Sequence, residues 1–151
     1  MKAAVYYETG RPDVFRYEDV PDPEPGPGDI VIDVEAVSIE GGDTLNRLGG
    51  DLARVPHIVG YQCAGTVSAA GEGVARFAVG ERVVTVGLDG SHAERRAVPA
   101  SFAWAVPEGV STEEAACVPV PAGWASPPFS WPSGPVPACS RPPRATTNLR
   151  G

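Results

Sequence analysis

The chain has 151 residues, of which 42% are hydrophobic, so it is long enough to form one domain with a buried core. Its net charge of -7 argues against binding to nucleic acid or to an anionic membrane, and we expect neither partner. No apolar run reaches the ~20 residues that span a bilayer, and residues 1–7 lack the apolar core of a secretory signal. Three cysteines without a repeating spacing favour a reducing, cytoplasmic location.

Composition divides the chain into two regions. All nineteen acidic residues lie at or before Glu114, whereas residues 119–151 have no acid, three arginines and nine of the seventeen prolines. We therefore assign residues 1–121 to one domain. The Pro/Ser/Arg-rich tail, residues 122–151, is expected to be disordered, because it cannot bury enough apolar surface to offset ~1–2 kcal/mol of backbone ordering per residue.

The first region alternates short strand-like stretches with glycine and proline turns. Strands are predicted at residues 2–7, 14–20, 29–37, 83–86, 93–98 and 102–106, and glycine-punctuated β-structure at residues 58–84. In the third stretch Ile30, Ile32, Val34 and Ala36 share one face, which we expect to be core. A short helix is predicted at residues 43–48, and the capping box formed by Ser111 and Glu114 begins another. The sequence therefore predicts a mostly β fold with short helices, either a barrel or a sandwich.

Several motifs occur in an order that resembles the medium-chain dehydrogenase/reductase superfamily, specifically its zinc-free quinone oxidoreductase branch. They are Met1-Lys2-Ala3, the Pro-Gly connector before Asp29-Ile30-Val31-Ile32, Glu40-Gly41-Gly42-Asp43-Thr44, Gly60-x-x-x-x-Gly65-x-Val67, Gly71-x-Gly73-Val74, Val79-Gly80-Glu81-Arg82-Val83 and Glu113-Glu114-Ala115-Ala116. Each motif is weak alone, but the ordered series is specific. The resemblance covers about residues 1–123.

This resemblance implies a GroES-like, partly open β-barrel that serves as a catalytic domain. In the family a Rossmann domain carrying NADPH normally follows, and the reaction transfers hydride from NADPH to a quinone or to the β-carbon of an enone. In this chain the Pro-rich tail stands where the Rossmann domain is expected. We therefore expect that domain to be absent and NADPH not to be bound by these residues.

Zinc-dependent relatives carry Gly-His-Glu where this sequence has Gly60-Tyr61-Gln62, and a cysteine where it has Ser38-Ile39-Glu40. Tyrosine and glutamine are poor replacements for imidazole, carboxylate and thiolate as zinc ligands. The other candidate ligands, which are His57, Cys63, His92 and Cys117, lack recognisable ligand spacing. We expect no metal site.

Three residues are candidates for the pocket, and each has a structural alternative. Tyr61 could donate a hydrogen bond to the reduced oxygen, or be a packed aromatic residue beside a strand. Asp43 could orient the pocket or cap the short helix. Glu40, which stands where many relatives have asparagine, could accept from the cofactor's amide or be a solvated loop charge. Gln62 is expected to satisfy backbone groups at the turn.

Two functions from different classes are consistent with this pattern. The first is a truncated amino-terminal catalytic domain of an NADPH-dependent quinone or enone oxidoreductase, inactive alone, with a frameshift near Gly123 as one origin of the tail. The second is a non-catalytic GroES-like module that pairs with a full-length relative. In either case we expect an unpartnered apolar side on the helix after Ser111, and self-association through open sheet edges.

Overall fold

The computed structural model describes residues 1–119, so the boundary at residue 121 and the expected disorder of residues 122–151 lie outside the described residues. Eight strands are described: β1 (Lys2–Tyr6), β2 (Arg16–Asp19), β3 (Asp29–Ser38), β4 (His57–Ile58), β5 (Gln62–Ala70), β6 (Arg82–Val86), β7 (Arg95–Pro99) and β8 (Ala103–Ala105). The helices of the same residues are α1 (Gly41–Leu48), α2 (Thr112–Ala116) and the 3₁₀ turns η1 (Pro12–Val14) and η2 (Ala100–Phe102). The predicted mostly β fold with short helices is confirmed.

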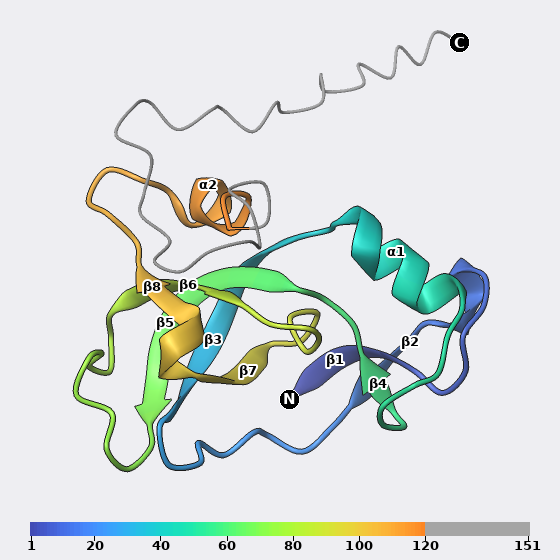
Figure 1. Cartoon of the computed structure of the whole chain (residues 1–151), viewed down its shortest axis with the longest axis horizontal. Helices are drawn as coiled ribbons and strands as arrows, with labels where there is room; N and C mark the ends of the chain where they lie inside the picture. Colours follow the sequence, from blue (N-terminus) through green and yellow to red (C-terminus); the bar gives the residue numbers. More distant parts are fainter. Residues whose placement is uncertain (120–151) are drawn as a thin grey trace, which may run out of the picture.

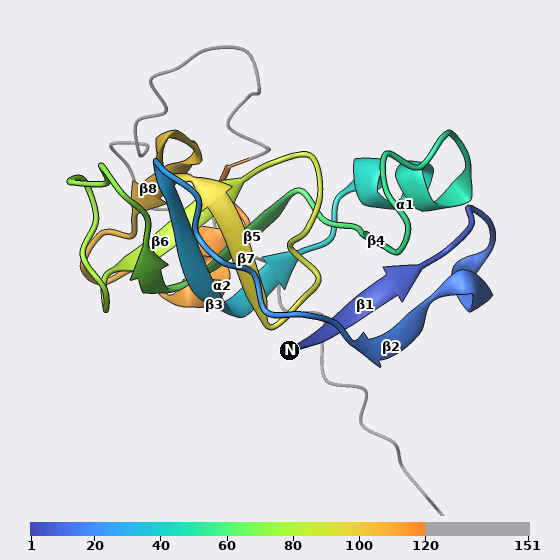
Figure 2. The same cartoon turned by 90° about the horizontal axis from the view of Figure 1, so that it is seen from below.

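The strands form two antiparallel sheets that contact each other along one side. The small sheet has the order β2-β1-β4 and the large sheet the order β7-β3-β5-β6-β8. A bridge between Ala3 and Ala93 joins β1 to the segment that precedes β7, and the amide of Val34 donates to the carbonyl of Glu94 at 2.8 Å. Figures 1 and 2 show the small sheet beside the large one, with α1 next to the first and α2 against the second. This arrangement is the partly open barrel expected of a GroES-like domain.

Strand β3 is an inner strand of the large sheet, where it pairs with β5 on one side and β7 on the other. Its residues Ile30 and Ile32 are fully buried in one core cluster, and Val34 packs against the same cluster. Ala36 was predicted to share this face, which is wrong: it packs against a second cluster formed with α2. The register between β3 and β5 shifts between Val34 and Ala36, and such a bulge moves the following side chains to the other face.

The pairing of β3 with β5 depends on the absence of a side chain at Gly65. A Cβ atom at this position would lie 1.9 Å from the backbone oxygen of Asp33. Two backbones can approach this closely only where no Cβ intervenes. The second glycine of the motif Gly60-x-x-x-x-Gly65 is therefore required by the close approach of β3 and β5.

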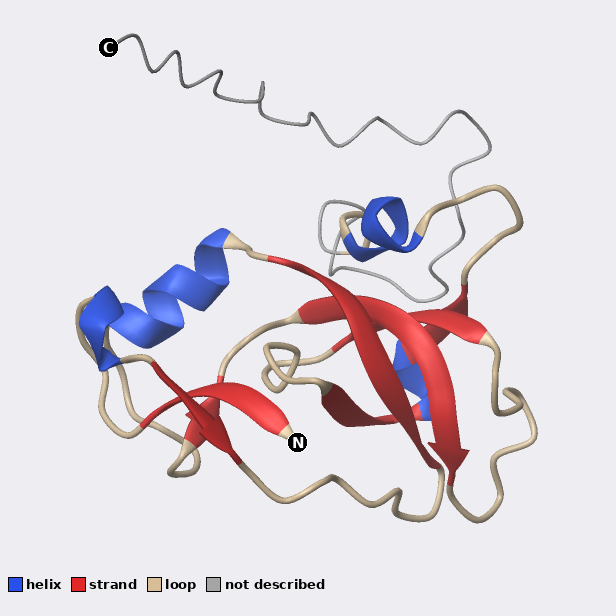
Figure 3. Cartoon of the chain, turned by 180° about the vertical axis from the view of Figure 1, so that it is seen from behind, coloured by secondary structure: helices blue, strands red, loops and turns tan. Residues whose placement is uncertain are grey.

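Helix α2 begins with the predicted capping box. The amide of Glu114 donates to Ser111 Oγ at 3.2 Å, and Glu114 Oε2 accepts from the Ser111 amide at 3.0 Å. The expectation that this helix lacks an apolar partner is wrong. Ala115 and Ala116 are buried against Ala64 of β5 and Val84 of β6, and Figure 3 shows the helix lying against the large sheet.

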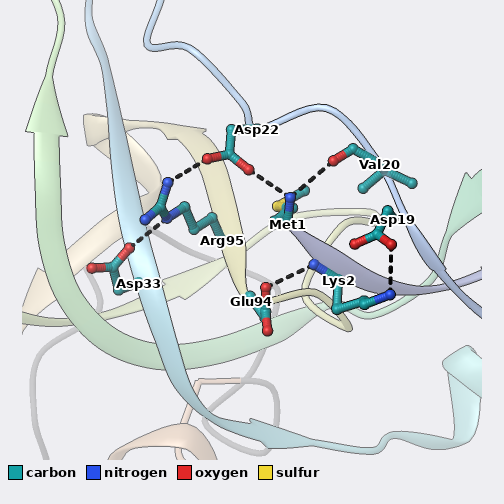
Figure 4. Close-up of polar contacts among 8 residues, drawn as sticks. All are labelled: Met1, Lys2, Asp19, Val20, Asp22, Asp33, Glu94 and Arg95. Carbon is teal, nitrogen blue, oxygen red and sulfur yellow. Dashed lines mark hydrogen bonds and ion pairs between the residues drawn. The ribbon is translucent and has the colours of Figure 1, made fainter.

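The connector between β2 and β3 is held at one point by a charged network, which Figure 4 shows. Asp22 binds the amino group of Met1 at 2.6 Å and the guanidinium of Arg95, and Arg95 also contacts Asp33 at 3.0 Å. The hydrogen bond from the amino terminus is the main cause that lowers the pKa of Asp22. The network links the first residue of the chain to both β3 and β7.

No helix among residues 1–119 is long and apolar enough to cross a membrane.

Candidate functional site

The predicted pocket residues gather where α1 begins and where the chain enters β5. Gly60 lies between β4 and β5 at a φ of 119°, and a Cβ there would lie 1.9 Å from Ser91 Oγ and 2.6 Å from His92 Cδ2. This close approach packs the segment before β5 against the turn between β6 and β7. Only glycine adopts such a φ without strain, so the motif glycine positions Tyr61 and Gln62.

Glu40, at the start of α1, is half-buried and hydrogen-bonded. Its Oε1 accepts from Gln62 Nε2 at 2.7 Å and from Ser38 Oγ at 3.0 Å. Gln62 is fully buried, so its amide brings the carboxylate against the entrance of β5. The two contacts fix the position of the side chain, and both interpretations of Glu40 stay predictions.

Asp43 is 3% exposed, and its Oδ2 accepts from the amide of Glu40 at 2.7 Å. It occupies the third helical position of α1, from which it holds the amide of the residue that caps the helix. Its other oxygen, Oδ1, is buried and has no hydrogen-bond partner. Asp43 therefore takes part in the capping box of the helix through one oxygen.

Tyr61 packs against the helix and is hydrogen-bonded to it. Its hydroxyl accepts from Asn46 Nδ2 at 3.0 Å, and a Cβ on Gly42 would lie 2.3 Å from the Tyr61 ring. These contacts match the packed-aromatic interpretation and place the phenol at the face of α1. The three candidates thus lie on connected elements: Glu40 contacts Asp43 directly, and Gln62, the residue after Tyr61, binds Glu40.

Arg96 of β7 is a site residue that sequence reasoning missed. It is 4% exposed, and its guanidinium donates to the carbonyls of Tyr61 and Asp89 at 3.2 and 2.6 Å and to Thr85 Oγ1 at 3.2 Å. The alternation of β7 could have identified it, because Arg96 and the buried Val98 are two residues apart and lie on the same face of the strand, whereas Arg95 lies on the exposed face. The guanidinium fixes the Tyr61 backbone relative to the turn before His92.

His92 lies on the other side of this turn. Its Nε2 is buried without a hydrogen-bond partner. Burial is the main cause that lowers the pKa of His92, and the guanidinium of Arg96 lowers it further, while the carboxylate of Asp43 opposes both.

Metal and dinucleotide binding were tested against the residues present. Residues 1–119 contain no cluster of three or more His, Cys, Asp or Glu side chains that could hold a metal. The glycines Gly71 and Gly73 form a turn after β5 that no helix follows, so this turn lacks the helix amino terminus that favours phosphate. This turn therefore does not fit the phosphates of a dinucleotide.

Comparison with known proteins identifies the class. The family of the alcohol dehydrogenase GroES-like domain matches residues 26–108. A 2-haloacrylate reductase of Burkholderia is 33% identical over 76% of this chain and 36% of its own length. Two solved structures each match 81% of the chain and 38% of their own: a mycobacterial quinone oxidoreductase, 37% identical with a TM-score of 0.76, and an Escherichia coli quinone oxidoreductase complexed with NADPH, 26% identical with a TM-score of 0.77.

The chain belongs to the alcohol dehydrogenase GroES-like domain family, and its relatives are members of the medium-chain dehydrogenase/reductase superfamily. The predicted resemblance is confirmed at this level. The chain spans 36% to 38% of the length of the three relatives described above.

Proposed function

We propose that this chain forms one wall of the active site of a cytoplasmic, zinc-free reductase that transfers hydride from NADPH to a quinone or an α,β-unsaturated carbonyl compound. The observation that carries the proposal is the similarity of four fifths of the chain to two quinone oxidoreductases, one of them complexed with NADPH. The hydrogen bond from Gln62 to Glu40 supports the absence of zinc in this proposal, because Gln62 stands where zinc-dependent relatives have glutamate.

We further propose that these 151 residues neither bind NADPH nor reduce a quinone alone. The described residues offer side chains that would face the reacting end of the cofactor, but no site for its phosphates. The cofactor, when bound, supplies the hydride. This chain's own residues would then position the acceptor, with Glu40 and Asp43 as orienting candidates, and the Tyr61 hydroxyl would donate a hydrogen bond to the charge on its oxygen.

An exposed apolar strip beside these candidates suits an apolar acceptor. Leu45 and Leu48 of α1 are 67% and 60% exposed, and Ile39, immediately before the helix, is 70% exposed. Residues three apart on a helix lie on the same face, so the two leucines form one surface. An acceptor lying on this strip would place its polar end near Glu40 and Tyr61.

Two measurements test the proposal. Titration of the 151-residue chain with NADPH, followed by cofactor fluorescence, should give no saturable binding, and NADPH mixed with benzoquinone should not be consumed. In a chimera this chain's residues 1–119 replace the matching part of the mycobacterial quinone oxidoreductase. The chimera should bind NADPH and reduce benzoquinone.

A chimera that binds NADPH but reduces neither quinone nor enone would overturn the reductase assignment. Saturable NADPH binding by the 151-residue chain would overturn only the claim that it lacks a cofactor site. Co-purification of the chain with a full-length relative, without NADPH consumption by the chimera, would favour the non-catalytic pairing module instead.

A further inference from the structure

Two carboxylates lie at the start of α1, and their hydrogen-bond donors are neutral. Glu40 Oε1 accepts from the side chains of Gln62 and Ser38 at 2.7 and 3.0 Å. Asp43 Oδ2 accepts from the backbone amide of Glu40 at 2.7 Å. None of the ion pairs described for residues 1–119 includes Glu40 or Asp43. The negative charge at the start of the helix is therefore not neutralised by a cation among these residues.

The cationic side chains of the neighbouring elements are bound to other groups. Arg47, in the last turn of α1, donates to the carbonyl of Gly10 at 2.6 Å. Arg54, in the segment before β4, pairs with the carboxylate of Asp89 at 2.8 Å. Arg96 is 4% exposed, and its guanidinium donates to two backbone carbonyls. An anionic ligand at the start of α1 would have to displace one of these contacts to gain a cationic partner.

The amino terminus of α1 would itself attract an anion, but carboxylates of the chain already occupy it. The aligned peptide dipoles of a helix amount to roughly half a positive charge at this end, whereas each ionised carboxylate carries a full negative charge. Asp43 also accepts from the amide of the capping residue Glu40, which an anionic ligand would otherwise bind. Residues 1–119 contain all nineteen acidic residues and nine of the twelve basic ones, so the long-range field has the same negative sign.

We propose that Glu40 is a specificity-determining residue, which makes the pocket select uncharged acceptors and reject those that carry a carboxylate or a sulfonate. The inference rests on the reductase function proposed above and names the substrate class of that site. Glu40 is half-buried, and Ile39, directly before it, is 70% exposed and belongs to the apolar strip that suits the acceptor. The carboxylate therefore borders the surface on which the acceptor would lie.

The selection follows from desolvation and from repulsion between like charges. An anionic acceptor would lose part of its hydration on the apolar strip without gaining a cationic partner, and the two carboxylates would repel it. A quinone, or an enone that is a ketone or an ester, has no net charge and meets neither obstacle. Acceptors of this uncharged kind are the substrate class that the start of α1 favours, and an acrylate anion is of the kind that it rejects.

The test uses nuclear magnetic resonance of the 151-residue chain and needs no NADPH. Hydroquinone and hydroquinonesulfonate, which differ by one anionic group, are titrated separately under argon at about pH 7.5, where carboxylates are ionised. Hydroquinone should shift the resonances of residues 39–48, and the dissociation constant of the sulfonate should be about tenfold higher or more.

Two variants assign this ratio of dissociation constants to one charge. Glu40→Gln keeps an oxygen that accepts from Gln62 but removes the charge, so the ratio should fall to about threefold or less while hydroquinone binds as before. Glu72→Gln is the matched control, because Glu72 is exposed in the turn after β5, at the other end of that strand from Gln62. This control should leave the ratio unchanged.

Wild-type protein provides a second readout that does not depend on a folded variant. In about 1 M salt, where the Debye length is about 3 Å, the ratio should fall and hydroquinone should bind as before. Equal binding of the two compounds, a ratio that neither salt nor Glu40→Gln changes, or no shift with either compound overturns the charge selection and leaves the reductase proposal intact. Failure of the chimera to reduce benzoquinone overturns the reductase proposal and leaves the measured charge preference intact.

Discussion

Gln62 Nε2 donates a 2.7 Å hydrogen bond to the carboxylate of Glu40, and this contact joins the entrance of β5 to the start of α1. Such polar contacts link α1 to the large sheet. The carboxylate also accepts from Ser38, the last residue of β3. The carboxylate therefore helps to fix the start of the helix that carries Asp43, while Tyr61 contacts the same helix at Asn46.

Removal of this carboxylate should destabilise the domain. In Glu40→Ala the fully buried amide of Gln62 loses a charged acceptor, so we expect the free energy of unfolding to fall by about 1–3 kcal/mol. Urea denaturation followed by circular dichroism measures the change. Glu8→Ala removes an exposed carboxylate and should change stability by less than about 0.5 kcal/mol. Equal effects of the two substitutions would contradict the proposed importance of the Glu40–Gln62 contact.

A methyl group at Gly65 should separate β3 from β5. The added Cβ would meet the backbone oxygen of Asp33 at 1.9 Å, and a backbone atom cannot move aside as a flexible side chain can. We expect Gly65→Ala to cost about 1–3 kcal/mol or more, as overpacked cores do. Gly41→Ala is the control, because a Cβ there meets nothing within 4 Å. If Gly65→Ala and Gly41→Ala had the same midpoint of thermal unfolding, β5 would be able to shift away from β3 without loss of stability.

Local pattern predicted the strands well, whereas the site depended on contacts between distant residues. Alternation placed Ile30 and Ile32 in the core, and the capping box located α2. The pattern could not show the bulge that moves Ala36 to the other face, because a bulge arises from pairing with β5.

The same limit applies to the site. Glu40, Asp43 and Tyr61 were selected through the family resemblance, and the structure brings them together, but their catalytic roles stay predictions. The contact of Glu40 with Gln62 could not be predicted from local pattern, because the two residues are 22 positions apart. Arg96 was overlooked although its parity in β7 marked it as inward-facing, since a buried guanidinium is unusual without a carboxylate partner.

The buried His57 and the half-buried His92 should make the domain sensitive to mild acid. Burial is the main cause that lowers the pKa of both His57 and His92 in the folded chain, whereas unfolded histidines titrate near about 6.5. Below that pH the unfolded chain binds more protons than the folded one, so the free energy of unfolding falls as the pH falls toward the lowered values. Denaturation at several pH values between about 7.5 and 5.5 measures this slope.

The double variant His57→Gln/His92→Gln should flatten the slope in that window, because it removes both groups that gain protons on unfolding. Below about pH 5 the carboxylates titrate as well, so the comparison is limited to the window above it. An unchanged slope in the double variant would assign the acid sensitivity to other groups.

Arg96 and its neighbour Arg95 allow the buried guanidinium to be separated from the general loss of a positive charge. Arg96→Met removes the donor to the Tyr61 and Asp89 carbonyls, so amide hydrogen exchange should become faster in the turn at residues 87–91. It also removes a charge that lowers the pKa of His92, so that pKa should rise. Arg95→Met breaks the exposed pairs with Asp22 and Asp33 and should leave both observables unchanged. If the exposed substitution changed the exchange of the turn as much as the buried one, the guanidinium of Arg96 would not be what holds Tyr61 beside the turn.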